Sequence, residues 1–246
     1  MENVAMTPDD AADFEEYKRR KKILELRGRL RGLEPTLLRK NASLSEIKNL
    51  CEQAKRLSSV CVCVQPVYVK TCKALLKNSG VGVSCVIGGN SESTIKAKIY
   101  EAGTALKEGA SELEFSPSIS AITNGNFNYF KREVKRVIRK ARGKTVKINL
   151  DAYSLPQDKF LRVAQIAVDS GAKYLSIRAE EDLITLLQRQ LKKKCEIKVV
   201  GVETHERFKD MLNFGCARVG SELAEEIVHA MEDEVNGLQY AINTEK

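Results

Sequence analysis

The sequence predicts an α/β protein in which eight parallel strands close into a (β/α)8 TIM barrel, preceded by an extra N-terminal helix. Short apolar, β-branched runs alternate with longer amphipathic runs, and eight such strand-plus-helix units follow one another. Runs such as Val60–Val64 are apolar throughout, as in strands buried on both faces. The 246 residues also match one barrel domain, which often has ~250. The alternative, an open doubly wound sheet, usually carries a glycine-rich phosphate turn, and the chain has neither GxGxxG nor GxxxxGK[ST].

The chain divides into a helical extension over residues 1–31 and a barrel over residues 32–246. In the extension, Thr7 is the expected N-cap, Pro8 occupies the first turn, and acidic residues precede basic ones, as the helix dipole favours. No composition shift marks a second domain within the barrel. The expected strands are residues 33–38, 60–64, 81–87, 111–115, 145–150, 173–177, 196–200 and 216–219. Helices are expected over about 43–57, 69–77, 93–107, 127–141, 154–170, 180–193, 204–213 and 221–232.

Local signals set several helix ends. Ser43 and Glu46 form a capping box, and three later helices begin at a hydroxyl residue: Ser154, Thr204 and Ser221. Three glycines each stand between the end of a helix and a strand, where a left-handed conformation ends a helix: Gly109, Gly171 and Gly215. Each expected strand is therefore followed by an expected helix.

Composition narrows the classes of function. The longest apolar runs are too short to cross a bilayer and the N-terminus does not resemble a signal peptide, so a cytoplasmic location and no membrane partner are expected. The seven cysteines agree with a reducing compartment, and two histidines without a metal-ligand spacing predict no metal site. The net charge of +8 draws attention to the basic residues 18–31, but no aromatic residues are interleaved there for base stacking. We interpret this segment as a solvated helix, and nucleic acid is not the expected partner.

Several segments, in one register from about residue 33 to 228, resemble deoxyribose-phosphate aldolase, a class I aldolase on a (β/α)8 barrel. Each motif is weak alone, and their order carries the resemblance. Glu34–Leu38 (EPTLL) is similar to Asp-His-Thr-Leu-Leu, Val62–Pro66 (VCVQP) to Val-Cys-Val-Asn-Pro, and Ser84–Gly88 (SCVIG) stands where the family writes Val-Ile-Gly. Three later segments also match: Gly109–Glu114 (GASELE), Lys147–Asp151 (KINLD) and Gly215–Gly220 (GCARVG).

The resemblance implies a lysine that forms an imine with an aldehyde, placed on the sixth strand in a Val-Lys-Thr-Ser run. This chain has Ser176 at that position, and serine forms no imine. Lys198 matches the family's second lysine and Lys147 another strand lysine. Glu114 replaces an aspartate, and we expect Lys147 and Glu114 to form an ion pair. These four residues are the candidate catalytic site; no cofactor is expected.

The resemblance also implies a phosphate site built from two turns. The first, Gly-Gly-Ile-Arg in the family, begins here at Gly201 and lacks the arginine; the second is Gly220-Ser221-Glu222. Backbone N–H groups near Ser221 could still bind an anion, but Glu222 and Glu203 place negative charge where a phosphate would lie.

Three hypotheses follow. The first is an aldolase-like barrel that has lost the parent reaction and acts as a binding or regulatory protein. The second is an active aldehyde-lyase that uses Lys198 or Lys147 on a small aldehyde or sugar. The third is a binder of nucleic acid or acidic surfaces through residues 18–31. The resemblance further implies a homodimer.

Overall fold

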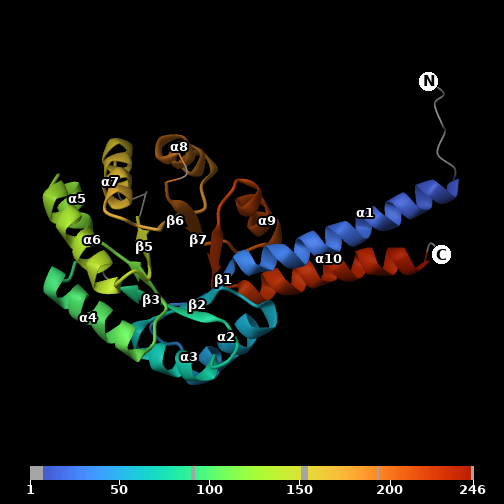
Figure 1. The fold of residues 1–246 in the computed structure, drawn as a ribbon, viewed down its shortest axis with the longest axis horizontal. Coiled ribbons are helices and arrows are strands. Elements are labelled where there is room, and N and C mark those ends of the chain that lie inside the picture. The colour runs from blue at the N-terminus through green and yellow to red at the C-terminus, as the bar shows by residue number, and fades with distance from the viewer. Residues whose placement is uncertain (1–7, 90–91, 151–154, 193, 245–246) are drawn as a thin grey trace.

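A computed structural model describes residues 8–89, 92–150, 155–192 and 194–244. Eight parallel strands form a closed barrel in sequence order, each pairing with the next and β8 pairing with β1, as predicted (Figure 1). The strands are β1 (Leu33–Leu37), β2 (Cys61–Val64), β3 (Gly82–Ile87), β4 (Glu112–Phe115), β5 (Thr145–Asn149), β6 (Tyr174–Arg178), β7 (Glu196–Val200) and β8 (Arg218–Ser221).

Helices surround the barrel, and every expected helix is present (Figure 1). They are α1 (Pro8–Arg29), α2 (Leu44–Leu57), α3 (Val69–Leu75), α4 (Ile95–Glu108), α6 (Phe127–Ala141), α7 (Gln157–Asp169), α8 (Glu181–Leu191), α9 (His205–Asn213) and α10 (Ala224–Thr244). A short helix α5 (Ile119–Thr123) and two 3-10 turns, η1 (Leu30–Gly32) and η2 (Pro66–Tyr68), were not predicted. The main apolar core lies between the outer face of the barrel and these helices.

Two of the expected N-caps, Ser43 and Thr204, are confirmed, whereas Ser221, expected to begin the last helix, is the last residue of β8 and α10 begins at Ala224. The Ser43 hydroxyl and the Glu46 carboxylate form the reciprocal capping box of α2, and the Thr204 hydroxyl accepts the Arg207 N–H at the start of α9. The three glycines have φ values of 114°, 100° and 85°, within the region where a side chain is disfavoured: Gly109, Gly171 and Gly215. Three residues with sequence expectations lie outside the described part of the chain: Thr7, Asp151 and Ser154.

The last helix is longer than predicted. We expected it to end near Glu232, but α10 continues to Thr244 and projects from the barrel beside α1, the two running antiparallel (Figure 1). We call this pair the arm. Buried side chains follow a heptad spacing on both sides of this contact, namely Ile23 and Leu26 on α1 with Leu30 in the following η1, and Met231, Val235 and Ile242 on α10. The partner helix therefore supplies the apolar contact that residues 233–244 need, and the pattern of this segment alone does not reveal it.

Two further features of the chain are the state of its cysteines and the hydropathy of its helices. All seven cysteines are free thiols, six of them buried and Cys195 half-buried. No helix in the described part of the chain combines the length and the apolar character needed to cross a membrane.

Candidate functional site

The interior of the barrel is charged. Barrel interiors are usually filled by branched aliphatic side chains, but here alternate positions of five strands point acids and bases into the lumen. Three carboxylates face three cations, so the formal charges cancel, and all six residues are buried: Glu34, Glu112, Glu114, Lys147, Lys198 and Arg218.

Glu34 lies at the centre of this network. The Lys147 ammonium donates to both Glu34 oxygens at 2.7 Å, and the Lys198 ammonium donates to Glu34 at 2.7 Å and to Glu114 at 2.6 Å. The expected Lys147–Glu114 pair is longer, at 3.9 Å, because Lys147 is drawn to Glu34. The structure thus brings Lys147, Lys198 and Glu114 together, as the sequence predicted, around a carboxylate that had not been singled out.

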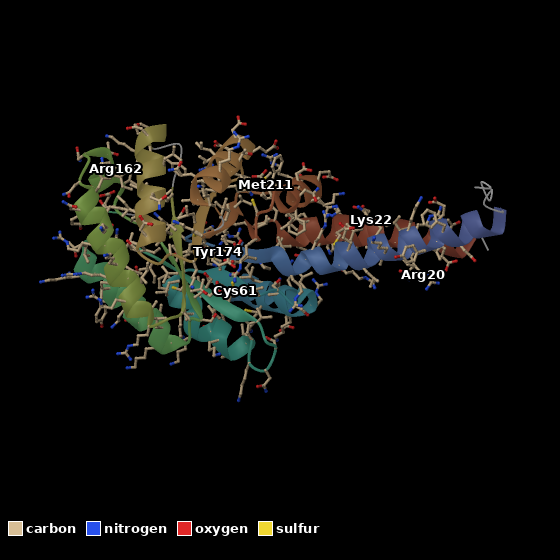
Figure 2. The ribbon with its side chains drawn as sticks, turned by 45° about the horizontal axis from the view of Figure 1, so that its top comes forward. Arg20, Lys22, Cys61, Arg162, Tyr174 and Met211 are labelled. Carbon is tan, nitrogen blue, oxygen red and sulfur yellow. The ribbon has the colours of Figure 1, made fainter. Side chains whose placement is uncertain are left out.

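A second pair lies deeper in the lumen. The Arg218 guanidinium binds Glu112 through two hydrogen bonds of 2.5 and 2.9 Å and stacks 4.8 Å from the centre of the Tyr174 ring. Cys61 is 3.5 Å from the same guanidinium, and Figure 2 places Cys61 and Tyr174 within the barrel, far from Arg20 and Lys22 on the arm. Bidentate geometry makes such a pair strong and fixes its orientation.

Burial and ion pairing oppose each other in setting the pKa values. Burial alone would raise the pKa of Glu34, but the attraction and hydrogen bonds of Lys147 and Lys198 outweigh it, and the pKa lies far below its ordinary value. Burial would likewise lower the pKa of both lysines, but the carboxylates Glu34 and Glu114 raise it. The nearby Cys61 thiol is uncharged at neutral pH, since burial raises its pKa well above the ordinary value.

Both lysines are therefore ammonium ions at neutral pH. A lysine that attacks a carbonyl needs a lowered pKa, which enzymes obtain by burial or by a neighbouring cation. Lys147 and Lys198 have the opposite environment, in which each lost proton would break two or more contacts to carboxylates.

Ser176 takes its place in the same network. It is fully buried on β6, pairs in register with Lys198 on β7, and its hydroxyl donates to Glu114 at 2.9 Å. The Ser176 side chain thus points into the lumen and supplies a hydroxyl to the network of charged residues.

A pocket of about 570 Å³ opens at the C-terminal ends of the strands, the end at which barrel enzymes carry their sites. Its lining includes Thr36, Cys63, Glu114, Asn149, Arg178, Lys198, Gly201, Glu203, Gly220, Ser221 and Glu222. The predicted phosphate residues Gly201, Gly220 and Ser221 therefore lie together with two of the predicted catalytic residues.

Several polar groups of the phosphate turns already have partners within the protein. The Ser221 hydroxyl donates to the Val202 carbonyl at 2.5 Å and accepts the Leu223 N–H at 3.0 Å. The Glu222 carboxylate accepts the Leu38 N–H at 3.1 Å across the pocket mouth. A Cβ at Gly220 would lie 2.9 Å from Cε of Lys198, so this glycine leaves room for the lysine.

Two groups of lumen residues have metal-ligand character, Glu34–Cys61–Glu112 and Glu34–Cys63–Glu114. Their carboxylate oxygens already accept hydrogen bonds from the two lysines and Arg218. Burial also raises the pKa of the Cys63 thiol, which disfavours the thiolate that a metal would require. The two lysines and Arg218 therefore supply the positive charge that a metal ion would bring to these carboxylates.

Sequence reasoning missed half of the network: Glu34, Glu112 and Arg218. A signal was present, because Glu112 and Glu114 alternate within one strand and so share a face. Because helices cover the outer face of that strand with apolar side chains, Glu112 and Glu114 must both point into the lumen.

The closed barrel of eight parallel strands makes this chain a TIM-barrel protein. Its pocket lies at the C-terminal ends of the strands, where TIM-barrel enzymes carry their active sites.

No family model matches the chain. The deoxyribose-phosphate aldolase of Caldicellulosiruptor saccharolyticus is 33% identical over 201 residues, which is 77% of this chain and 91% of the relative. That of Bdellovibrio bacteriovorus is 31% identical over 202 residues, 78% of this chain and 91% of the relative. The chain belongs to the deoxyribose-phosphate aldolase family.

Solved structures agree with this fold. The aldolase QR15 superimposes with a TM-score of 0.78 at 22% identity, covering 82% of this chain and 95% of QR15. The deoxyribose phosphate aldolase from Aeropyrum pernix gives a TM-score of 0.75 at 21% identity, covering 89% and 97%. The fold and the family that the sequence motifs implied are both confirmed.

Proposed function

We propose that this barrel has lost the retro-aldol reaction of its family and uses the pocket at the strand ends to bind a small, neutral carbonyl or hydroxylated compound, as a binding or regulatory protein. The observation that carries the proposal is the combination of a serine at position 176 with two lysines that carboxylates hold as ammonium ions. Imine formation needs an unprotonated amine, and neither lysine is placed to supply one.

The mouth of the pocket supports a neutral ligand. Glu222 and Glu203 line it, and the N–H of Leu223 is occupied by the Ser221 hydroxyl. A phosphate dianion would meet two carboxylates there, and Arg178 is the cation that lines the pocket outside the lumen network. Thr36, Asn149 and the Ser176 hydroxyl provide neutral polar groups in or beside the same space.

Borohydride trapping tests the loss of imine chemistry. We expect no site-selective reduced adduct when the protein is incubated with 2-deoxyribose 5-phosphate or a panel of small neutral aldehydes, as read by intact and peptide mass spectrometry. The physical reason is the raised pKa of both lumen lysines. A single adduct on Lys198 or Lys147 would overturn the proposal and establish the second candidate below.

Ser176→Lys is the matched positive control. The new amine would lie beside the Lys198 ammonium, which lowers the pKa of a neighbouring amine, so we expect a trapped adduct at position 176 with a small neutral aldehyde. Turnover of 2-deoxyribose 5-phosphate should stay well below the ~1–10³ s⁻¹ of typical enzymes, because the phosphate turns are altered too. Adding Glu222→Gln should raise this turnover. Full activity of Ser176→Lys alone would show that the phosphate site is intact.

The second candidate is an active class I lyase that uses Lys198 on an uncharged aldehyde or sugar. It is favoured by one observation, that Lys198 lines the pocket directly. This mechanism would require a substrate that displaces Lys198 from Glu34 and Glu114 before attack. Trapping with neutral aldehydes distinguishes the two candidates, because only the lyase forms an adduct there.

A further inference from the structure

The positive charge of the chain is concentrated on one helix. Residues 127–144, which span α6 and the turn after it, contain eight lysines and arginines and one glutamate, so they carry a net charge of +7. The whole chain carries +8. The N-terminal residues 1–31, with eight basic and seven acidic residues, carry only +1. The basic surface of this protein is therefore on α6 and not on the arm.

The single acid of this segment does not neutralise the surface. Glu133 points inward and is fully buried, where it accepts the Lys98 ammonium at 2.6 Å and the Ser118 N–H at 2.9 Å. On the arm, acids pair instead with basic neighbours along the helix, as in Lys18–Glu15 at 2.7 Å and Arg20–Glu16 at 2.6 Å. The two basic segments thus differ in the charge that they present to a partner.

The cations of α6 and α4 line a groove of about 640 Å³. Its walls are Lys96, Ile99, Tyr100, Arg136, Arg139, Lys140 and Arg142, five cations with no carboxylate among them. In the described part of the chain none of the five cations forms an ion pair with a carboxylate. Helices α4 and α6 lie side by side on the outside of the barrel, on the side away from the arm (Figure 1).

The groove also carries an aromatic ring. Tyr100 on α4 is 79% exposed. Along α6, Arg136, Arg139 and Arg142 recur every three residues, which corresponds to a rise of about 4.5 Å at 1.5 Å per residue. A row of cations beside an exposed ring matches the surfaces that bind single-stranded nucleic acid, where cations follow the phosphates and aromatic rings stack on bases.

We propose that the α4–α6 groove, defined by Lys96, Tyr100, Arg136, Arg139, Lys140 and Arg142, binds single-stranded nucleic acid. The surface is distinct from the pocket at the strand ends, so this inference stands independently of the proposed ligand. An anionic membrane would fit the charge, but it would favour several apolar side chains to insert beside the cations, and Tyr100 is the one large exposed apolar residue of the groove. The sequence had directed attention to residues 18–31; the structure assigns this role to α6.

Fluorescence anisotropy of the full-length protein with a labelled 20-nucleotide DNA strand of mixed sequence tests the proposal, with an RNA of the same sequence as a second probe. Five phosphate contacts predict a slope of log K against log salt of about −3.5, which weakens binding about 100-fold between 50 and 200 mM salt. Arg136→Glu/Arg139→Glu should reduce the affinity at least ~tenfold and make this slope shallower. Tyr100→Ala should weaken binding at every salt concentration without changing the slope, because stacking releases no counterions.

The matched control reverses two charges on the arm, Arg20→Glu/Lys21→Glu, and should change the affinity less than about twofold. Circular dichroism of each variant verifies that the exposed substitutions leave the fold intact. An equal loss in the arm variant would overturn the assignment to α6, as would the absence of binding at 50 mM salt. Tighter binding to vesicles of phosphatidylserine than to the oligonucleotides would also overturn it, in favour of a membrane surface.

Discussion

Glu34→Gln is expected to lower the free energy of unfolding by about 3–5 kcal/mol, the usual cost of removing one partner from a buried ion pair. The Glu34 carboxylate accepts hydrogen bonds from both lumen lysines. Glutamine keeps the volume but removes the charge, so the lumen would hold three buried cations and two carboxylates, with one positive charge unpaired. Urea unfolding at pH 7, followed by circular dichroism, measures the change.

Two controls separate charge from other effects. Glu52→Gln breaks an exposed pair with Lys55, in which the Glu52 side chain is 64% exposed, and should change stability by less than ~0.5 kcal/mol. Glu34→Gln/Lys147→Met removes one charge of each sign and should be more stable than Glu34→Gln alone, so the two substitutions are strongly non-additive. A loss below about 1 kcal/mol for Glu34→Gln would show that the lumen is not held by this network.

The fold was predictable because each of its determinants is local. The alternation of apolar strands and amphipathic helices gave all eight units in order, and single residues such as Ser43, Thr204 and Gly109 fixed helix ends. The extension of α10 to Thr244 was not predictable in this way, because residues 233–244 are stabilised by α1, which lies more than two hundred positions earlier.

The site was predictable in part for a related reason. Alternation along strands, together with the family resemblance, indicated that Lys147, Lys198, Glu114 and Ser176 share the lumen, and they do. Which acid pairs with which base depends on how the barrel closes and how its strands are staggered, and spacing along the chain does not contain this information. Glu34, on the strand where the barrel closes, was missed for this reason.

The balance of charge in the lumen is also the basis for the proposed loss of imine chemistry. A Schiff-base lysine needs surroundings that favour its neutral form. This lumen has three carboxylates for three cations, which keeps every amine protonated. A lysine at position 176 would add a fourth cation to three carboxylates, and this excess of positive charge would favour the neutral form of its amine.

Acid is expected to unfold this protein through the same residues. The pKa of Glu34, Glu112 and Glu114 is lowered in the folded state, because the attraction of Lys147, Lys198 and Arg218 outweighs burial. The unfolded chain, with ordinary glutamate pKa values near ~4.3, therefore binds protons first as the pH falls. The stabilisation from these groups is present above that pH and is lost below it, at about 1.4 kcal/mol for each unit that a pKa is lowered.

The two lumen lysines set the alkaline limit of the pH range in which the protein is most stable. Their folded pKa is raised, so their contribution is complete below the unfolded value near ~10.4 and is lost as the pH rises through the folded one. Since both sets of shifts describe the same ion pairs, their energies do not add. Urea midpoints between pH 3 and 11 should give a plateau from about pH 5 to 10 with a decline on either side, and a shallower acid decline in Glu34→Gln. A stability maximum near pH 4, where half of an ordinary carboxylate population is protonated, would show that these carboxylates are not held in their charged form by the barrel.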